Sequence, residues 1–324
     1  MLSPVVIGAL IQTGVIVILC VGFTFTYMVE KFPNFAHTAI ATFGTVLSYS
    51  LVRIYGFNPY TTIPLSMLLC GLISLLLYVA IIRPIKATGA REITLTFALF
   101  AIAQVMASIV NIYSYWYMLN QGSPTAGFSL VSRDFKWGGY PGVLLVIIPV
   151  CAVLVAALWF FLTKVKQGIA FRAVAEDEVL ASSLGVNTNI VHILTWLITG
   201  ALAGLAGAMI PLWRYTGLGY NDEFLLLVMA GSVMGGINSV AGALIGGFLA
   251  ATSQKVLGAL AIAAFGVEAV SYESLYPTIL IATILMLEPE GIMGFFDHPH
   301  NPAETLKTYA NRLRRILAKA THAT

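Results

Sequence analysis

The chain has 324 residues, of which 59% are hydrophobic and only 10% are charged, with a formal net charge of +3. Soluble domains carry about 25% charged residues, so this composition excludes an ordinary soluble protein and indicates a membrane protein. The small net charge gives no reason to expect a nucleic-acid partner.

Nine apolar runs, each bounded by charged residues, Pro or Gly, follow one another along the chain. They cover about residues 5–28, 35–52, 62–82, 92–113, 141–163, 190–212, 223–237, 240–262 and 275–287. A helical span needs about 20 apolar residues, whereas a membrane barrel shows alternation over segments of about ten. The seventh and ninth runs are short, and we expect them to be tilted, re-entrant or buried among neighbours. The pattern predicts an all-α, polytopic membrane helix bundle with about nine candidate spans.

The positions of Lys and Arg predict the orientation, because cytoplasmic connections retain these residues. With the N-terminus outside, most of the 17 Lys and Arg residues fall in cytoplasmic connections. We therefore expect the N-terminus outside and the C-terminus in the cytoplasm, in a multi-pass protein of the cell (plasma) membrane. Residues 164–189 then lie in the cytoplasm.

The connection over residues 114–140 is the longest external one and is rich in aromatic residues. These are Tyr115, Trp116, Tyr117, Phe135, Trp137 and Tyr140. We favour an aromatic belt at the membrane interface, where Trp and Tyr are enriched. The alternative is a landing surface for an external partner.

The cytoplasmic insert at residues 164–189 is longer than a plain connection requires. Residues 168–184 read as one short helix, Gly185 suits the left-handed stop after it, and Asn187 or Thr188 can cap the next span. Three consecutive acids, residues 176–178, would be repelled by anionic headgroups. The insert therefore indicates a docking element for a protein rather than a helix resting on lipid.

Small residues recur four positions apart in the later runs. The glycines concerned are Gly200, Gly204, Gly207, Gly231, Gly235, Gly242 and Gly246. Such spacing lets helix backbones approach closely in lipid. We predict that these glycines serve helix packing rather than ligand binding.

Residues 297–324 differ in composition from the membrane domain over residues 1–296. Their apolar positions recur at helical spacing between Lys and Arg residues. A basic amphipathic cytoplasmic tail of this kind most often lies on anionic lipid. Contact with a cytoplasmic subunit is the minority interpretation.

No residues point to chemistry at membrane depth. The carboxylates lie near the ends of the runs, the five His make no pair on one helix face, and no Gly-Lys pair exists, so a Walker A motif is absent. We predict no catalytic residues, no metal site and no ATP-binding motif. Lys255 is the one charge deep in a run; it is equally well interpreted as a functional group or as a side chain that reaches the interface. The candidate residues of a translocation pathway are Asn34, His37, Gln104, Gln254 and Lys255.

Five motifs in order over residues 24–294 resemble one known family. The cytoplasmic insert supplies Gly168, Arg172, Ala173, Glu176, Asp177, Ala181, Gly185, Val186 and Asn187, followed by Ala201, Gly204, Ala206 and Gly207. The other four motifs, in chain order, are Tyr27 and Met28 with Asn34, Phe35, Ala36 and His37; Arg83 with Pro84; Gly235, Gly236, Gly242, Ala243, Gly246 and Gly247; and Pro289, Gly291 and Gly294. They are similar to the branched-chain amino acid permeases of ABC importers, which include urea and amide permeases. Thr38 and Glu288 depart from the family pattern, where Gly and Arg are usual.

The resemblance implies a membrane-spanning subunit that imports branched-chain or hydrophobic amino acids, urea or amides, and is not itself an enzyme. Its partners would be a second permease, two cytoplasmic ATP-binding subunits that hold ATP and Mg, and an external solute-binding protein. The implied coupling residues are Gly168, Arg172, Ala173, Glu176, Asp177, Ala181 and Gly185. The alternatives are a secondary transporter or channel, which needs ionisable residues near the midplane, and an intramembrane enzyme or scaffold, which no feature supports.

Overall fold

The computed structural model describes residues 3–121, 127–217, 220–266, 268, 272, 275–287 and 291–293. Each of the nine apolar runs forms a helix within this part of the chain. These helices are α1 (Pro4–Glu30), α2 (His37–Ile54), α3 (Thr62–Leu77), α5 (Glu92–Gln121), α6 (Gly142–Lys164), α9 (Thr188–Met209), α10 (Tyr220–Gly235), α11 (Val240–Phe265) and α12 (Leu275–Leu287). The basic tail over residues 297–324, with Glu288, Pro289 and Gly294, lies outside the described residues.

Six helical segments of the described chain are long and apolar enough to cross a membrane. They are Pro4–Glu30, Thr62–Ala87, Glu92–Asn120, Gly142–Lys164, Thr188–Leu212 and Val240–Phe265. The helices α2, α10 and α12 have 18, 16 and 13 residues and are not among them. The multi-pass helical membrane fold is therefore confirmed, and the number of nine spans is not.

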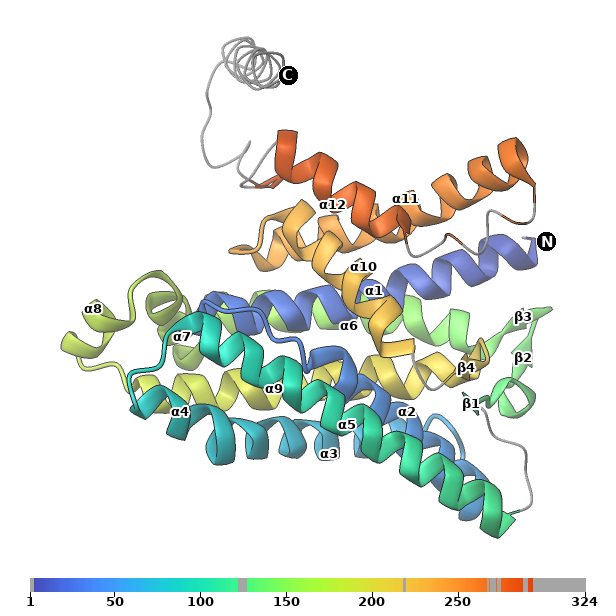
Figure 1. The fold of residues 1–324 in the computed structure, drawn as a ribbon, viewed down its shortest axis with the longest axis horizontal. Helices are drawn as coiled ribbons and strands as arrows, with labels where there is room; N and C mark the ends of the chain where they lie inside the picture. The colour runs from blue at the N-terminus through green and yellow to red at the C-terminus, as the bar shows by residue number, and fades with distance from the viewer. Residues whose placement is uncertain are drawn as a thin grey trace, which may run out of the picture.

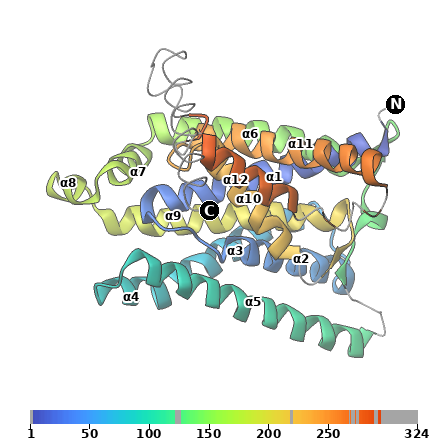
Figure 2. The same cartoon turned by 45° about the horizontal axis from the view of Figure 1, so that its top comes forward.

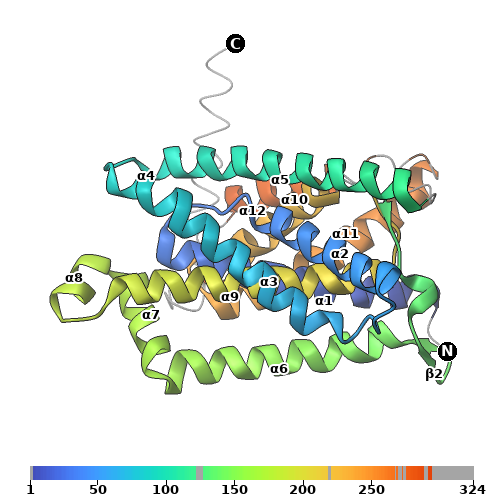
Figure 3. The same cartoon turned by 90° about the horizontal axis from the view of Figure 1, so that it is seen from below.

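The helices form an elongated bundle with two different ends (Figure 1). At one end lie the short helices α4 (Arg83–Ala87), α7 (Lys166–Glu176) and α8 (Glu178–Ser183), and at the other end lie four short strands and the start of α1. Seen after a turn of 45°, α5 lies on one side of the bundle while α6 and α11 lie on the other (Figure 2). From below, α1, α2, α3 and α9 fill the space between α5 and α6 (Figure 3).

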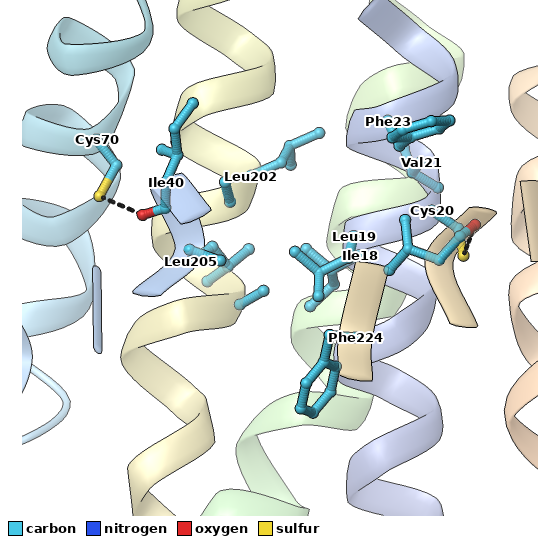
Figure 4. Packing of buried hydrophobic residues seen from close by; sticks show 14 of the residues in the cluster. Ile18, Leu19, Cys20, Val21, Phe23, Ile40, Cys70, Leu202, Leu205 and Phe224 are labelled. Atoms are coloured by element: carbon cyan, nitrogen blue, oxygen red, sulfur yellow. Dashed lines mark hydrogen bonds between the residues drawn. The ribbon is translucent and has the colours of Figure 1, made fainter. Parts of the chain in front are cut away.

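Helix α9 lies at the centre and packs against α1, α2 and α3. Its Leu202 and Leu205 lie in the apolar cluster together with Ile18 of α1 and Ile40 of α2, and all four are buried or nearly so. Figure 4 shows α9 between α3, which carries Cys70, and α1. The Cys70 thiol donates to the backbone oxygen of Ile40 at 3.6 Å. A thiol this deeply buried is chemically quiet and serves as a small apolar side chain.

The strand end is built by the connection after α5 and the segment after α9. Strand β1 (Gly127–Phe128) pairs antiparallel with β4 (Thr216–Gly217), and β2 (Lys136–Trp137) pairs with β3 (Tyr140–Pro141). Two 3₁₀ turns, η2 (Val131–Arg133) and η3 (Ile210–Leu212), lie beside them. Tyr117 and Phe128 are buried against Tyr49, whereas Trp137 is 73% exposed. The aromatic residues of this connection therefore divide between packing and surface.

The span Thr62–Ala87 contains a π-helical turn, η1 (Tyr78–Ile82), between α3 and α4. Pro84 lies two residues after this turn, and a proline inside an α-helix clashes with the carbonyl four residues earlier and removes one hydrogen bond. A wider turn before the proline relieves this conflict without ending the helix. The span therefore continues through Arg83 and Pro84 to Ala87.

Candidate functional site at the charged end

The cytoplasmic insert predicted from the sequence forms two helices, α7 and α8, rather than one. The backbone of Asp177 is extended, with φ −148° and ψ 107°, and its Oδ1 accepts a hydrogen bond from the backbone N–H of Leu180 at 2.9 Å. Aspartate side chains favour this capping geometry at the start of a helix. The prediction of one helix over residues 168–184 is therefore wrong, because one of its acids starts a second helix.

The chain turns sharply between α6 and α7 at Val165, whose backbone is extended with φ −92° and ψ 135°, and Gly168 packs against the end of α6. A Cβ added at Gly168 would lie 1.9 Å from the backbone oxygen of Phe161, so only glycine fits this corner. After the corner, Phe171 stacks on Phe25 of α1 with the ring centroids 4.1 Å apart, and Val174 is buried beside it. The apolar face of α7 thus lies on α1 and fixes the direction of the insert.

The insert ends in a turn that returns the chain to the bundle. Gly185 has φ +88°, and the N–H of Val186 donates to the oxygen of Ala181 at 3.0 Å. Asn187 then caps α9 by accepting from the N–H of Ile190 at 3.3 Å. The predicted left-handed glycine and the Asn187 cap are both present.

The outer surface of α8 combines apolar and charged side chains. Val179 is 80% exposed, Leu184 is 77% exposed, and Leu180 is exposed between them, whereas Ala181 is buried. Four of the predicted coupling residues are exposed as well: Arg172, Ala173 and Glu176 on α7, and Asp177 at the start of α8. The remaining three, Gly168, Ala181 and Gly185, shape the helices that carry this surface. Figure 1 shows α7 and α8 projecting beyond the rest of the bundle.

A cluster of charged residues lies beneath this surface, around the buried carboxylate of Glu30 at the end of α1. Lys86 Nζ donates to Glu30 Oε2 at 2.8 Å, and Trp196 Nε1 donates to Oε1 at 2.8 Å. His192 Nδ1 lies 2.8 Å from the same Oε1, and its Nε2 lies 2.9 Å from Glu178 Oε1 on α8. We call Glu30, Lys86, Glu178, His192 and Trp196 the charge cluster.

Two neighbouring contacts support the charge cluster. The ring of Tyr78, in the π-helical turn, stacks on His192 and Trp196 with centroids 5.9 and 5.6 Å away. Lys31 Nζ donates to the backbone oxygen of Ala175 at 2.5 Å and so ties the end of α1 to α7. Sequence reasoning missed this assembly because its members come from four separate parts of the chain. Their only signal was a set of ionisable residues at the ends of the apolar runs.

The candidate pathway residues lie in three different settings. Asn34 is buried and accepts from the N–H of Ala36 at 3.1 Å, and His37 Nε2 lies 3.1 Å from the oxygen of Leu19. Gln254 accepts from Gln12 Nε2 at 3.0 Å between α11 and α1, with the half-buried Lys255 beside it. Gln104 is exposed on α5. These contacts are interhelix and turn hydrogen bonds, and they do not gather the five residues into one polar site.

The small-residue positions lie where helix backbones meet. A Cβ at Gly207 would lie 1.9 Å from the oxygen of Ala41 on α2, and one at Gly204 would lie 2.4 Å from the oxygen of Ser66 on α3. Gly200 faces Ser74 and Cys70 of α3. We call this close contact of α9 with α2 and α3 the first glycine seam. In the second seam, between α10 and α11, Gly231 and Gly235 face Gly246, Gly247 and Gly242.

Comparison with known proteins places the chain among transport permeases. The sequence profile of the family described as "Branched-chain amino acid transport system / permease component" matches residues 5–287. The chain is 31% identical over 287 residues to a probable branched-chain amino acid transport permease protein, LivH, of Methanocaldococcus jannaschii, covering 89% of this chain and 91% of that one.

Two further relatives show how broad the similarity is. The high-affinity branched-chain amino acid transport system permease protein BraD of Pseudomonas aeruginosa is 25% identical over 289 residues, covering 86% of this chain and 91% of that protein. A ribose import permease, RbsC, of Haemophilus influenzae is 24% identical over 271 residues, covering 80% and 79%. With six apolar spans among its described residues and a profile match over residues 5–287, this multi-pass protein of the cell membrane belongs to the family of branched-chain amino acid transport permeases.

Proposed function

We propose that this chain is the membrane-spanning subunit of an ATP-driven importer for branched-chain amino acids, and that an ATPase subunit docks on α7 and α8. The observation that carries the proposal is the exposed surface of the two helices, which presents Val179, Leu180 and Leu184 from α8 and its C-cap and Arg172 and Glu176 from α7. It projects from the bundle, it combines apolar and charged groups, and it stands on a glycine corner that fixes its direction. A surface with an apolar centre and a charged rim is typical of a protein contact.

The proposed topology follows from the two ends of the bundle. Helix α1 begins at the strand end, and α7 and α8 lie at the opposite end (Figure 1). If the ATPase docks on α7 and α8, that end is cytoplasmic and the N-terminus is outside. This agrees with the orientation that the Lys and Arg residues predict.

The strand end is then where an external solute-binding protein would dock. Exposed aromatic side chains gather on its connections, among them Tyr55, Phe57, Trp137 and Tyr215. Aromatic residues are enriched at protein interfaces because they bury a large area with few rotatable bonds. A second permease subunit, either a copy of this chain or a related one, would complete the pathway, with two ATPase subunits that hold ATP and Mg below it.

The substrate is proposed from the named relatives. LivH of M. jannaschii and BraD of P. aeruginosa are named as branched-chain amino acid permeases, and the ribose permease is a more distant match. We therefore expect leucine, isoleucine or valine, with urea, short amides and ribose as the competing solutes.

The test is transport by the reconstituted complex. The chain, purified with its candidate ATPase and second permease, is placed in proteoliposomes with the external binding protein, and radiolabelled leucine uptake is measured with and without ATP. We expect uptake that needs ATP and the ATPase subunit. Uptake driven by an ion gradient, without any ATPase subunit, would show that the protein is a secondary transporter instead.

A further inference from the structure

The charge cluster determines the protonation state of His192. The Glu30 side chain has no exposed surface, and it receives N–H donors from Lys86 and Trp196. A buried carboxyl with these partners is a carboxylate, which only accepts hydrogen bonds. His192 Nδ1, at 2.8 Å from Glu30 Oε1, must therefore carry a hydrogen.

The second ring nitrogen of His192 faces another carboxylate. Glu178 Oε1 lies 2.9 Å from His192 Nε2, and the Glu178 side chain is 46% exposed. A neutral imidazole would point a lone pair at this oxygen, whereas an imidazolium donates from both nitrogens. With His192 charged, two carboxylates face two cations, and the low-dielectric cluster is neutral as a whole.

This imidazolium joins the outer helix α8 to the membrane helices. The titratable and charged groups that face it are Glu30 from α1, Lys86 from α4, Glu178 from α8 and Tyr78 from the π-helical turn. The other attachments of α8 are mainly local: the Asp177 cap, the buried Ala181 and the turn at Gly185. The contact between His192 and Glu178 is thus the charged link from α8 to α1 and α9.

We propose that His192 is a positioning residue for transport, and that its imidazolium holds α8 against α1 and α9 so that force applied to α8 reaches the membrane helices. The part about force rests on the proposed docking of an ATPase at α8. When His192 loses a proton, its lone pair faces the Glu178 carboxylate, the link breaks, and α8 moves independently of the bundle. The link is therefore closed at lower cytoplasmic pH and open at higher pH.

The deciding experiment is amide hydrogen exchange of the full chain in lipid nanodiscs, without any solute or partner. Exchange of the peptide covering residues 177–187 is measured at about pH 6 and about pH 9, corrected for intrinsic rates, because the ordinary imidazole pKa of about 6.5 lies between these values. We expect protection of this segment in the parent to fall several-fold at the higher pH. Protection that is equal at both values would overturn the proposal.

Two variants separate the charge link from simple packing. In Glu178→Gln the amide can accept from an N–H or donate to a lone pair, so protection should persist at both pH values. In His192→Gln the titrating group is gone, and protection should be lower and independent of pH. The control is Glu92→Gln, which removes an exposed carboxylate at the same end of the bundle, at the start of α5, and should follow the parent.

A pH response that is unchanged in both variants would show that another group causes it, and this result would overturn the proposal. Because the Glu178→Gln variant changes an exposed side chain, it remains informative even if His192→Gln fails to fold.

The consequence for transport is measured in the reconstituted complex as leucine imported per ATP hydrolysed. We expect this ratio to fall several-fold in His192→Gln and to change little with Glu92→Gln, while the ATPase subunit stays bound. If the parent shows no ATP-driven uptake at all, the proposed function fails, whereas the hydrogen-exchange result still decides whether His192 holds α8. If the parent transports normally and His192→Gln keeps the parent ratio, only the role of His192 in transport is refuted.

Discussion

The glycine seams inside the bundle and the attachment of α8 at its end are held by opposite kinds of contact. In the seams, backbones touch directly: Gly207 lies on Ala41, and Gly235 lies on Gly242. Such contacts are numerous, apolar and insensitive to pH or charge. At the end, α8 depends on a cap, one buried alanine and the charged pair of His192 and Glu178. The comparison indicates that the packed helices form a rigid body, whereas the attachment of α8 depends on a charged contact.

Replacing Gly207 by Ala should have the largest effect on folding. The new Cβ would lie 1.9 Å from the oxygen of Ala41, so α9 and α2 must separate. Overpacking of this kind costs roughly 1–3 kcal/mol, and we expect the upper part of that range because the obstacle is backbone. Thermal unfolding in detergent measures the loss. The matched control is Gly258→Ala in α11, where the nearest atom is 3.7 Å away; an equal loss in both would contradict the importance of the seam.

Replacing Gly185 by Val tests the turn at the end. Nothing lies within 4 Å of a Cβ there, but the backbone has φ +88°, which a β-branched residue adopts only with strain of about 1–2 kcal/mol. We expect a small drop in the unfolding temperature and loss of ATP-driven leucine uptake, because α8 would be displaced. Gly185→Asn, which tolerates a left-handed backbone, should retain uptake. Normal uptake by the Val variant at equal membrane levels would show that the turn does not position the coupling surface.

Replacing Tyr60 by Phe tests the strand end. The Tyr60 hydroxyl donates to Asp134 Oδ1, and Asp134 Oδ2 accepts from the N–H of Val143 at 3.3 Å. Loss of the hydrogen bond from Tyr60 should lower the free energy of unfolding by about 1 kcal/mol. Burial and the Asp134 carboxylate raise the pKa of Tyr60, so the bond is present below the ordinary value of about 10 and is lost only as pH rises through the raised value. The difference in unfolding temperature between parent and variant should therefore persist to alkaline pH; a difference that vanishes by about pH 9 would contradict this bond.

Replacing Arg172 by Glu should have the smallest effect on stability. The side chain is exposed on α7, and surface substitutions usually change stability by less than about 0.5 kcal/mol. ATP-driven uptake should nevertheless be lost, because the charge would be reversed in the proposed contact with the ATPase. Arg172→Lys is the control. A Glu variant that still transports leucine at the parent rate would remove Arg172 from the docking surface.

Local patterns in the sequence predicted the parts of the fold that local physics decides. The apolar runs gave the positions of nine helices, Gly185 gave the left-handed turn, and Asn187 gave the cap of α9. The break at Asp177 was missed because an acidic residue is equally acceptable on an exposed helix face and in a cap. The charge cluster was missed for a different reason. Glu30, Lys86 and His192 meet only after three helix ends have been brought together, and no spacing within one segment encodes that meeting.

The π-helical turn at Tyr78–Ile82 also sets the rotation of the residues that follow it in the span Thr62–Ala87. An α-helix advances by about 100° for each residue, so one residue accommodated in a widened turn rotates the next segment by roughly that angle. Lys86 points at Glu30 in this rotated register. If the widened turn became regular α-helix with every residue kept, Lys86 would be carried around to another face. The partner of Glu30 therefore depends on the widened turn in the backbone as much as on the identity of residue 86.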